Sequence, residues 1–388
     1  MISQFTIRLV NDTIDSSDVL RLTEWLRGDP RLTKGDQTVL FEQQWSEWQG
    51  RRHSVFVNSG SSANLAMLYA LMLSGRMKNK KVVVPAISWV TTVSPVIQLG
   101  LEPIMCDSDK ETLGIDVDQL KWIFDYEKPA ALVIVHVLGF PNKMDEIINL
   151  CLEHGVILLE DSCESVGSTY DGIKTGNFGL MSSFSTYYGH HFSTIEGGIV
   201  NTDDEELYHI LLSIRSHGWD RDLPEHKREE LRKAEGVSEF RALYTFYYPG
   251  FNLRSTDLQA FIGIGQLQKL DGFVKKRNDN FLMYNSLVKN DFWKIQVPDG
   301  CFVSNFAYPI VLPDDKFNRA IHELHSNGVE IRPLVCGSIS QQPFWKKLGR
   351  PSYTPFADMV HNHGMYLPNN PQMSTQDIEF VCSIINNI

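Results

Sequence analysis

The segment NSGSSANL at 58–65 has the composition of an anion-binding turn. It follows an apolar run and opens a helical pattern, so Gly60 lets the backbone turn tightly. Ser61 and Ser62 place hydroxyl groups beside the first N–H groups of the helix, which have no partner within it and favour negative charge. The segment therefore suits a phosphate group. An ordinary turn with a serine cap would give the same pattern.

A second polar segment, LLEDSCES at 158–165, places Asp161 just past an apolar strand. In an open α/β sheet, ligands bind at the carboxyl ends of the strands. A carboxylate there can pair with the protonated nitrogen of a pyridine ring and keep that ring an electron sink. The alternative is an aspartate that caps a helix.

A third segment, SFSTYYGHHFSTIEGGIV at 183–200, contains the adjacent residues His190 and His191. Adjacent side chains project differently and rarely reach one metal together, and no acidic residue, histidine or cysteine at helical spacing completes a zinc site. A single histidine can move protons near neutral pH. A structural histidine is the alternative interpretation.

A fourth segment, YPGFNLRSTDLQAFIG at 248–263, places Asn252 and Arg254 before an amphipathic helical pattern. From the residues alone, they fit an ordinary helix entry with a solvated arginine.

Apolar runs that alternate with helical patterns predict the elements that position these segments. The expected strands are 53–58, 81–85, 102–106, 130–136, 156–160, 180–186 and 198–202. Several are unbroken Val, Ile and Leu runs, as in strands covered on both faces. Helical patterns at 62–75 and 144–155 lie between them, with Gly155 as a C-cap. The alternation predicts an α/β fold with a mixed, mainly parallel central sheet and helices on both faces.

The second half of the chain has a different pattern. Residues 204–290 are charged and mostly helical, and 221–236 reads as a surface insertion. A smaller C-terminal α+β unit is expected from a strand at 303–312, a helix at 315–328, a run at 329–335 and a last helix with Ser374 and Asp377 as its capping box. We place the domain boundary near residue 255, which gives a large domain at 1–255 and a small domain at 256–388.

The bulk properties exclude several classes of protein. The 388 residues carry a net charge of −11, so the chain has no general attraction for nucleic acid or anionic lipid. No apolar run approaches the roughly 18 residues that cross a bilayer. The start, MISQFTIRLVNDTI, lacks the pattern of a signal peptide, so we expect a cytoplasmic protein. The six cysteines show no C-x-x-C pair or zinc spacing and read as reduced thiols.

Taken in order, these segments resemble the DegT/DnrJ/EryC1/StrS sugar aminotransferase family, within the pyridoxal-phosphate enzymes of fold type I. The similarity runs over nearly the whole chain. It is carried by TKGDQTVLFEQQW (33–45), SGSSAN (59–64), PAISWVTT (85–92), EDSCES (160–165), EGG (196–198), RSHGW (215–219), NLRSTDLQA (252–260) and IRPLV (331–335). Eight motifs in the same order make the resemblance specific.

The resemblance implies how the phosphate of the cofactor is held. Gly60, Ser61 and Ser185 would bind the phosphate within one subunit. Asn252 would reach the phosphate in a neighbouring subunit. The active unit would therefore be at least a homodimer with shared active sites.

The resemblance also implies roles around the cofactor ring. Trp89 would stack on the ring, Asp161 would pair with the pyridine nitrogen, and Glu164 would lie near the ring hydroxyl. The cofactor would be pyridoxal 5'-phosphate or its amine form, pyridoxamine 5'-phosphate. No metal is implied.

The sequence departs from the family pattern at the lysine that carries the cofactor as a Schiff base. In family aminotransferases this lysine lies six residues before the Glu of E-G-G, and the same count from Glu196 ends at His190. The nearest upstream lysine, Lys174, lies in DGIKTGNFG and reads as a surface residue. Histidine forms no such Schiff base, so we expect a non-covalently bound cofactor that rests as pyridoxamine phosphate.

Histidine at this position resembles the 3-dehydratase branch of the family. GHHFSTIEGG, EDSCES and SHGW are close to the pattern of enzymes that act on GDP-4-keto-6-deoxy-D-mannose, on the route to colitose in lipopolysaccharide O-antigens. The related iron–sulfur dehydrases carry an extra cysteine cluster that is not visible here. The resemblance implies that His190 moves protons, that the sugar loses its 3-hydroxyl group, and that L-glutamate restores the amine form of the cofactor.

Other interpretations stay open for the substrate and for the activity. His217, Arg221 and Arg332 are candidates to meet phosphate or sugar oxygens, and they could equally be solvated or structural cations. A nucleotide-sugar 4-aminotransferase that uses another lysine is one alternative. A non-catalytic cofactor-binding protein is the other, although it would not need Trp89 and Glu196 in place. The nucleotide and the sugar are implied by the resemblance alone.

Overall fold

The central sheet contains all seven strands that the apolar runs predict, in the order β1-β9-β8-β5-β4-β2-β3. Their bounds are β1 His53–Val57, β2 Lys81–Pro85, β3 Glu102–Cys106, β4 Ala131–Val135, β5 Ile157–Asp161, β8 Met181–Ser185 and β9 Gly198–Thr202. In this computed structural model, which describes residues 5–289, 292–350 and 352–388, β9 runs antiparallel to both neighbours. The other adjacent pairs are parallel. The expected mixed, mainly parallel α/β sheet is confirmed.

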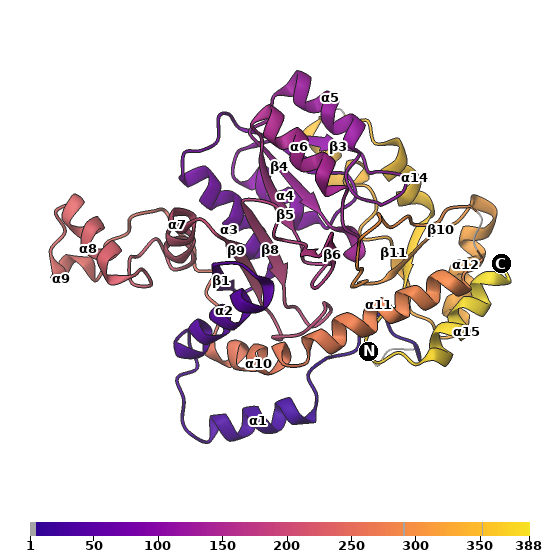
Figure 1. The fold of residues 1–388 in the computed structure, drawn as a ribbon, viewed down its shortest axis with the longest axis horizontal. Helices are drawn as coiled ribbons and strands as arrows, with labels where there is room; N and C mark the ends of the chain where they lie inside the picture. The colour runs from indigo at the N-terminus through magenta and orange to yellow at the C-terminus, as the bar shows by residue number, and fades with distance from the viewer. Residues whose placement is uncertain (1–4, 290–291, 351) are drawn as a thin grey trace.

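Helices cover both faces of this sheet (Figure 1). They are α2 Asp36–Gln49, α3 Gly60–Leu73, α4 Val90–Gln98, α5 Val117–Glu127, α6 Met144–His154 and α7 Glu205–Arg215. Because side chains alternate along a strand, Val82 and Val84 pack in the core that includes α3 and α7, whereas Val83 packs with α5 and α6. Gly155 ends α6 in the left-handed conformation, as expected.

A second, antiparallel sheet in the order β10-β12-β11 belongs to the C-terminal part. Its elements are β10 Tyr308–Val311, α12 Asp314–Ser326, β11 Arg332–Pro333, α13 Pro343–Leu348, α14 Pro355–His363, β12 Gly364–Leu367 and α15 Thr375–Asn386. The capping box of α15 is confirmed, whereas β12 was not expected. Helices α10 Asp257–Leu267 and α11 Leu270–Leu287 join the two parts, since α10 packs on α2 and α11 packs on α15. The boundary near residue 255 stays a prediction.

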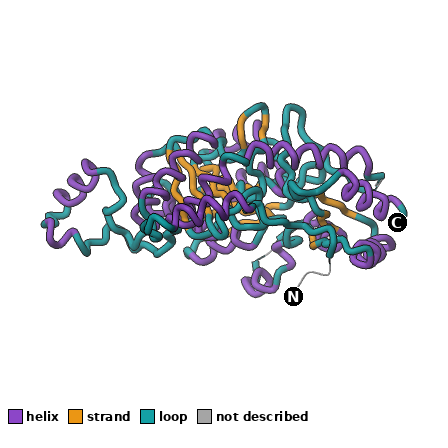
Figure 2. The backbone as a smooth tube through the Cα atoms, turned by 90° about the horizontal axis from the view of Figure 1, so that it is seen from below, coloured by secondary structure: helices purple, strands orange, loops and turns teal. Residues whose placement is uncertain are grey.

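A helical excursion projects from one end of the molecule (Figures 1 and 2). It carries α8 Glu225–Ala234 and the short α9 Glu239–Ala242, and α8 has no buried residue. The expected surface position of 221–236 is therefore confirmed for α8, whereas Leu223 before it is buried; that the segment is an insertion stays a prediction. The remaining short elements are β6 Thr169–Tyr170, β7 Ile173–Lys174 and the 3₁₀ turns η1 Val137–Gly139 and η2 Ile339–Gln341. Among the described residues, none of the helices has the length and apolar character needed to cross a membrane.

The segment before α1 (Ser16–Leu26) lies along the C-terminal part, which the sequence did not predict. We call residues 6–13 the N-terminal strap. Ile7 pairs with Val329 in a parallel bridge, and the side-chain amide of Asn370 donates to the carbonyl oxygen of Arg8 over 2.8 Å. The strap thus contacts residues of the C-terminal part that lie just outside the second sheet.

Candidate active site

A cavity of about 660 Å³ lies at the carboxyl ends of β5 and β8. Asp161 and Ser185, the last residues of these two strands, both line it. Its other walls come from the starts of α3 and α4, the segment from Tyr187 to His190, the N-terminal strap, and the edge of the second sheet. This is where ligands bind in open α/β sheets.

The cavity brings together eight of the eleven site residues that the sequence predicts. These are Gly60, Ser61, Trp89, Asp161, Glu164, Ser185, His190 and Arg332. Asn252, His217 and Arg221 do not line it. Residues that the sequence did not single out also line it, among them Asn64, Thr92 and Arg8.

The start of α3 forms a small cradle beside Ser185. Ser59 caps the helix, and its hydroxyl accepts from the N–H of Ser62 over 3.1 Å. A Cβ atom on Gly60 would lie 2.6 Å from the Cβ of Ser185, so only glycine allows this close approach. The helix N-terminus and the hydroxyls of Ser61 and Ser185 consequently border one space, which fits a phosphate group.

Asp161 presents a buried carboxylate to the cavity, with only 4% of the residue exposed. Its Oδ2 accepts from Asn64 Nδ2 and from Thr92 Oγ1, each over 2.7 Å, and its Oδ1 accepts from the N–H of Cys163 over 3.1 Å. No helix begins after Asp161, so it does not cap one. Oδ1 keeps room for a further donor, which fits a protonated pyridine nitrogen. Asn64 and Thr92 lie in the SGSSAN and PAISWVTT motifs.

His190 lines the cavity as a neutral imidazole whose tautomer is determined by one contact. Its Nδ1 lies 2.8 Å from the carbonyl oxygen of Cys163. Because a carbonyl only accepts, Nδ1 carries the hydrogen and Nε2 keeps a lone pair. Burial lowers the pKa of His190 to about 4. At neutral pH, the side chain is therefore in the form that can accept a proton.

His191 serves the fold instead. Its Nε2 lies 3.0 Å from the carbonyl oxygen of Ser304, its side chain is fully buried, and it does not line the cavity. Burial lowers its pKa well below the usual range. The two adjacent histidines therefore lie in different surroundings, one at the cavity and one within the fold.

Glu164 is a second buried carboxyl group in the cavity. Its Oε2 accepts from the N–H of Leu138 over 2.7 Å. Burial raises the pKa of Glu164 to about 7; the hydrogen bond from Leu138 opposes this rise and the charge of Asp161 adds to it. Near neutral pH the group can donate as well as accept a hydrogen bond, which fits a partner for a ring hydroxyl.

Two further features of the cavity concern the cofactor: the exposure of Trp89 and the residue types of the described lining. Trp89 lines the cavity with 54% of its surface exposed, so a ring face is available for stacking. No lysine is found among the described residues that line the cavity. Lys174 is half-buried rather than at the surface as expected, because it donates to the Trp48 carbonyl and lies 3.8 Å above the Trp48 ring. It does not line the cavity either.

The three predicted residues outside the cavity lie close together in one region. Ser216 and Asn252 form an antiparallel bridge, and the N–H of His217 donates to the carbonyl oxygen of Phe251 over 2.6 Å. The guanidinium group of Arg221 lies 3.8 Å from the centre of the Trp219 ring. Within a single chain, these residues do not reach the site.

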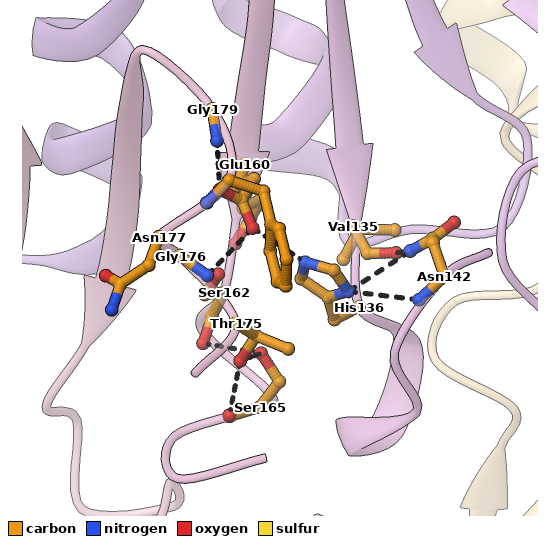
Figure 3. A network of polar contacts seen from close by, with 12 residues as sticks. Val135, His136, Asn142, Glu160, Ser162, Ser165, Thr175, Gly176, Asn177 and Gly179 are labelled. Carbon is orange, nitrogen blue, oxygen red and sulfur yellow. Dashed lines mark hydrogen bonds and ion pairs between the residues drawn. The ribbon is translucent and has the colours of Figure 1, made fainter. Parts of the chain in front are cut away.

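A buried polar network connects residues at the ends of β4 and β5 (Figure 3). His136 Nε2 lies 3.0 Å from Glu160 Oε2, which also accepts from the N–H of Gly176. Glu160 Oε1 accepts from the N–H of Gly179 over 2.6 Å. Burial alone would raise the pKa of Glu160, but these hydrogen bonds lower it. The network fixes the residue next to Asp161 and serves a structural purpose.

The lowered pKa of His190 predicts an acid-sensitive fold. The unfolded chain takes up this proton near pH 6.5, whereas the folded chain does so near pH 4. Stability is therefore complete above pH 6.5 and falls as the pH drops toward 4, by up to about 1.4 kcal/mol per pH unit for this group. Urea unfolding of the cofactor-free protein from pH 8 to 5 should show a shallower loss for His190→Asn than for the unsubstituted chain. Equal slopes would contradict the assigned protonation state.

The chain matches known proteins along most of its length. A model of the DegT/DnrJ/EryC1/StrS aminotransferase family matches residues 12–386. A GDP-4-keto-6-deoxy-D-mannose 3-dehydratase of Yersinia pseudotuberculosis is 37% identical over 366 residues, covering 91% of this chain and 92% of that protein.

Solved structures of similar proteins agree with this match. The E. coli GDP-4-keto-6-deoxy-D-mannose-3-dehydratase with bound hydrated PLP superposes with a TM-score of 0.90 at 33% identity, covering 98% of this chain and 99% of that one. A GDP-4-keto-6-deoxymannose-3-dehydratase with a trapped PLP–glutamate geminal diamine superposes with a TM-score of 0.89 at 32% identity, covering 98% and 100%.

Proposed function

Because the chain belongs to the DegT/DnrJ/EryC1/StrS aminotransferase family, we propose that it is a pyridoxal-phosphate-dependent 3-dehydratase of a nucleotide-linked 4-keto-6-deoxy sugar. The substrate is GDP-4-keto-6-deoxy-D-mannose and L-glutamate is the amino donor, as in colitose-type dideoxysugar synthesis. One observation carries the proposal. The cavity contains the residues to which the family resemblance assigns contacts with the cofactor, whereas His190 stands at the position of the family's lysine and no described lining residue is a lysine. The similarity to dehydratases over nine-tenths of the chain supports it.

Different residues of the cavity contact different parts of the cofactor. Gly60, Ser61 and Ser185 bind the phosphate, and Trp89 covers one face of the ring. Asp161 keeps the ring nitrogen protonated, while Glu164 faces the ring hydroxyl. When bound, pyridoxamine phosphate supplies the amine that condenses with the keto group and a ring that spreads negative charge.

His190 moves the protons. Its neutral Nε2 accepts a proton from the aminomethyl carbon, and the imidazolium so formed can protonate the 3-hydroxyl group as it leaves. A lysine at this position would recapture the cofactor and return the proton to the sugar carbon, which is transamination. Histidine lacks the amine for that step, so elimination of the hydroxyl is the outcome.

The direct test is incubation with pyridoxal phosphate, L-glutamate and GDP-4-keto-6-deoxy-D-mannose. The proposal predicts a product that has lost one oxygen atom and kept its keto group, with release of ammonia. Mass spectrometry separates this product from one that has exchanged its keto oxygen for an amine. An aminated product, or unchanged sugar from a cofactor-loaded protein, would overturn the proposal. Parallel reactions with other nucleotide 4-keto sugars define the nucleotide.

The active unit in this proposal is a homodimer with shared sites. Asn252, His217 and Arg221 lie outside the cavity of their own chain and group together, so they serve the cavity of a second copy. Exposed apolar side chains on α1 and α2, such as Leu20 and Val39, supply surface that a second copy would cover.

Mixing two inactive variants tests the shared site. In a hybrid dimer of His190→Asn and Asn252→Ala chains, one cavity collects both substitutions and the other collects none. We therefore expect hybrids, purified through two different tags, to recover about half of the turnover of the unsubstituted dimer, whereas each homodimer stays impaired. If Asn252 served its own cavity, each cavity would keep one defect and the hybrid would recover nothing.

A further inference from the structure

The charge of the cavity is poorly matched to an anionic substrate. Its described lining contains five carboxyl side chains and two guanidinium groups, Arg8 and Arg332. The carboxyl groups are those of Asp12, Asp161, Glu164, Glu196 and Glu330. A nucleotide diphosphate must therefore be met by specific cations, since the part of the cavity that this chain supplies has no general positive field.

The two arginines differ in what they already contact. Arg332 Nη2 lies 2.8 Å from Glu330 Oε1, so its charge is already paired. Arg8 is exposed, and it forms no ion pair with any residue that the structure describes. It is thus the arginine of this lining whose charge is available to a ligand.

The backbone at Arg8 is held firmly although its side chain is not. Its carbonyl oxygen accepts from Asn370 Nδ2 over 2.8 Å. The N–H of Leu9 donates over 3.1 Å to Glu330 Oε2, on the carboxylate that also binds Arg332. A guanidinium group on a fixed wall loses little entropy beyond its own side chain when it binds a ligand.

We propose that Arg8 of the N-terminal strap binds the diphosphate of the nucleotide-sugar substrate, an assignment that rests on the proposed function. Asp161 and Glu164 are buried deep in the cavity, whereas Arg8 is exposed at its rim. A sugar whose keto carbon lies near His190 points its diphosphate outward. In glutamate, by contrast, the α-carboxylate is attached to the reacting carbon, so it lies in the buried part of the cavity and away from Arg8. The planar fork of arginine matches two phosphate oxygens at once.

Binding of GDP alone tests this assignment without turnover. By calorimetry, Arg8→Gln should weaken GDP binding about tenfold or more while guanosine binds both proteins equally. Arg8→Lys should recover part of the loss. Arg319→Gln, which removes an exposed arginine of α12 outside the cavity, should bind GDP normally. Equal GDP affinity in Arg8→Gln and the unsubstituted protein, or no GDP binding by either, would overturn the assignment.

Kinetics separate the two anionic substrates. Arg8→Gln should raise the KM for the nucleotide sugar, with kcat and the KM for glutamate within about twofold. A rise confined to the KM for glutamate would overturn the assignment to the diphosphate. If GDP binding depends on Arg8 but no sugar loses oxygen, the proposed reaction fails while the diphosphate site stands.

Discussion

Replacing His190 with asparagine should lower the turnover of the nucleotide sugar by about 10²–10⁴-fold, the usual contribution of a positioned acid–base group. Asparagine is polar and can still donate to the carbonyl oxygen of Cys163, so the local structure should be kept. It cannot take up a proton. Cofactor binding, followed by absorbance, should change little, because the predicted phosphate and ring contacts belong to other residues. Full turnover in this variant would show that His190 is not the base.

His191→Asn is the matched control for that experiment. His191 is the neighbouring residue, but it contacts Ser304 and does not line the cavity. We expect this variant to lose stability, because a buried group is changed, and to keep its turnover at a temperature where circular dichroism shows it folded. A loss of turnover as large as that of His190→Asn would point to a shared structural effect.

Asp161→Asn should produce the second large loss, about 10²–10³-fold in turnover, as when one preorganised electrostatic group is removed. The amide is almost the same size, but it carries no charge to hold a proton on the pyridine nitrogen. Rapid mixing of the pyridoxamine form with the keto sugar isolates the affected step. Unchanged rates in Asp161→Asn would show that the carboxylate does not act on the ring.

Thr92→Val provides the comparison for Asp161→Asn. It removes one of the hydrogen bonds to the carboxylate and leaves the charge in place. Its effect on turnover should therefore be much smaller. Equal losses in the two variants would mean that the position of the carboxylate matters more than its charge.

The apolar runs of the sequence predicted the central sheet and the residues that line the buried part of the cavity. Unbroken apolar runs such as ALVIV (131–135) predict buried strands when helical patterns flank them. Because parallel strands end at the same edge, the polar residues at the ends of β5 and β8 and just after β8 were expected to meet there. Asp161, Ser185 and His190 line one cavity for this reason.

The N-terminal strap was not predictable in the same way. It is joined to the C-terminal part by contacts between residues more than 300 positions apart, such as Ile7 with Val329. These are backbone and amide hydrogen bonds, which leave no periodic pattern in the sequence. The short strand β12, which is four residues long and directly follows α14, was missed for a similar reason.

Single residues in three of the family motifs hold the fold together. Glu42, in the first motif, accepts from the N–H of Phe56 over 2.7 Å and forms a buried ion pair with Arg215, the first residue of RSHGW. Asp257, in NLRSTDLQA, accepts from the N–H and the hydroxyl of Thr38. Membership of a family motif therefore does not show whether a residue binds a ligand or supports the fold. A buried charged residue requires its structural partner as strictly as a binding residue requires its ligand.

Borohydride reduction of the protein loaded with one equivalent of pyridoxal phosphate, followed by mass spectrometry, tests the central claim most directly. The claim is that His190 leaves the cofactor without a covalent attachment. We predict that the unsubstituted chain keeps its mass, whereas His190→Lys gains one reduced cofactor at residue 190 and loses dehydration. A stoichiometric adduct on any lysine of the unsubstituted chain would contradict the account.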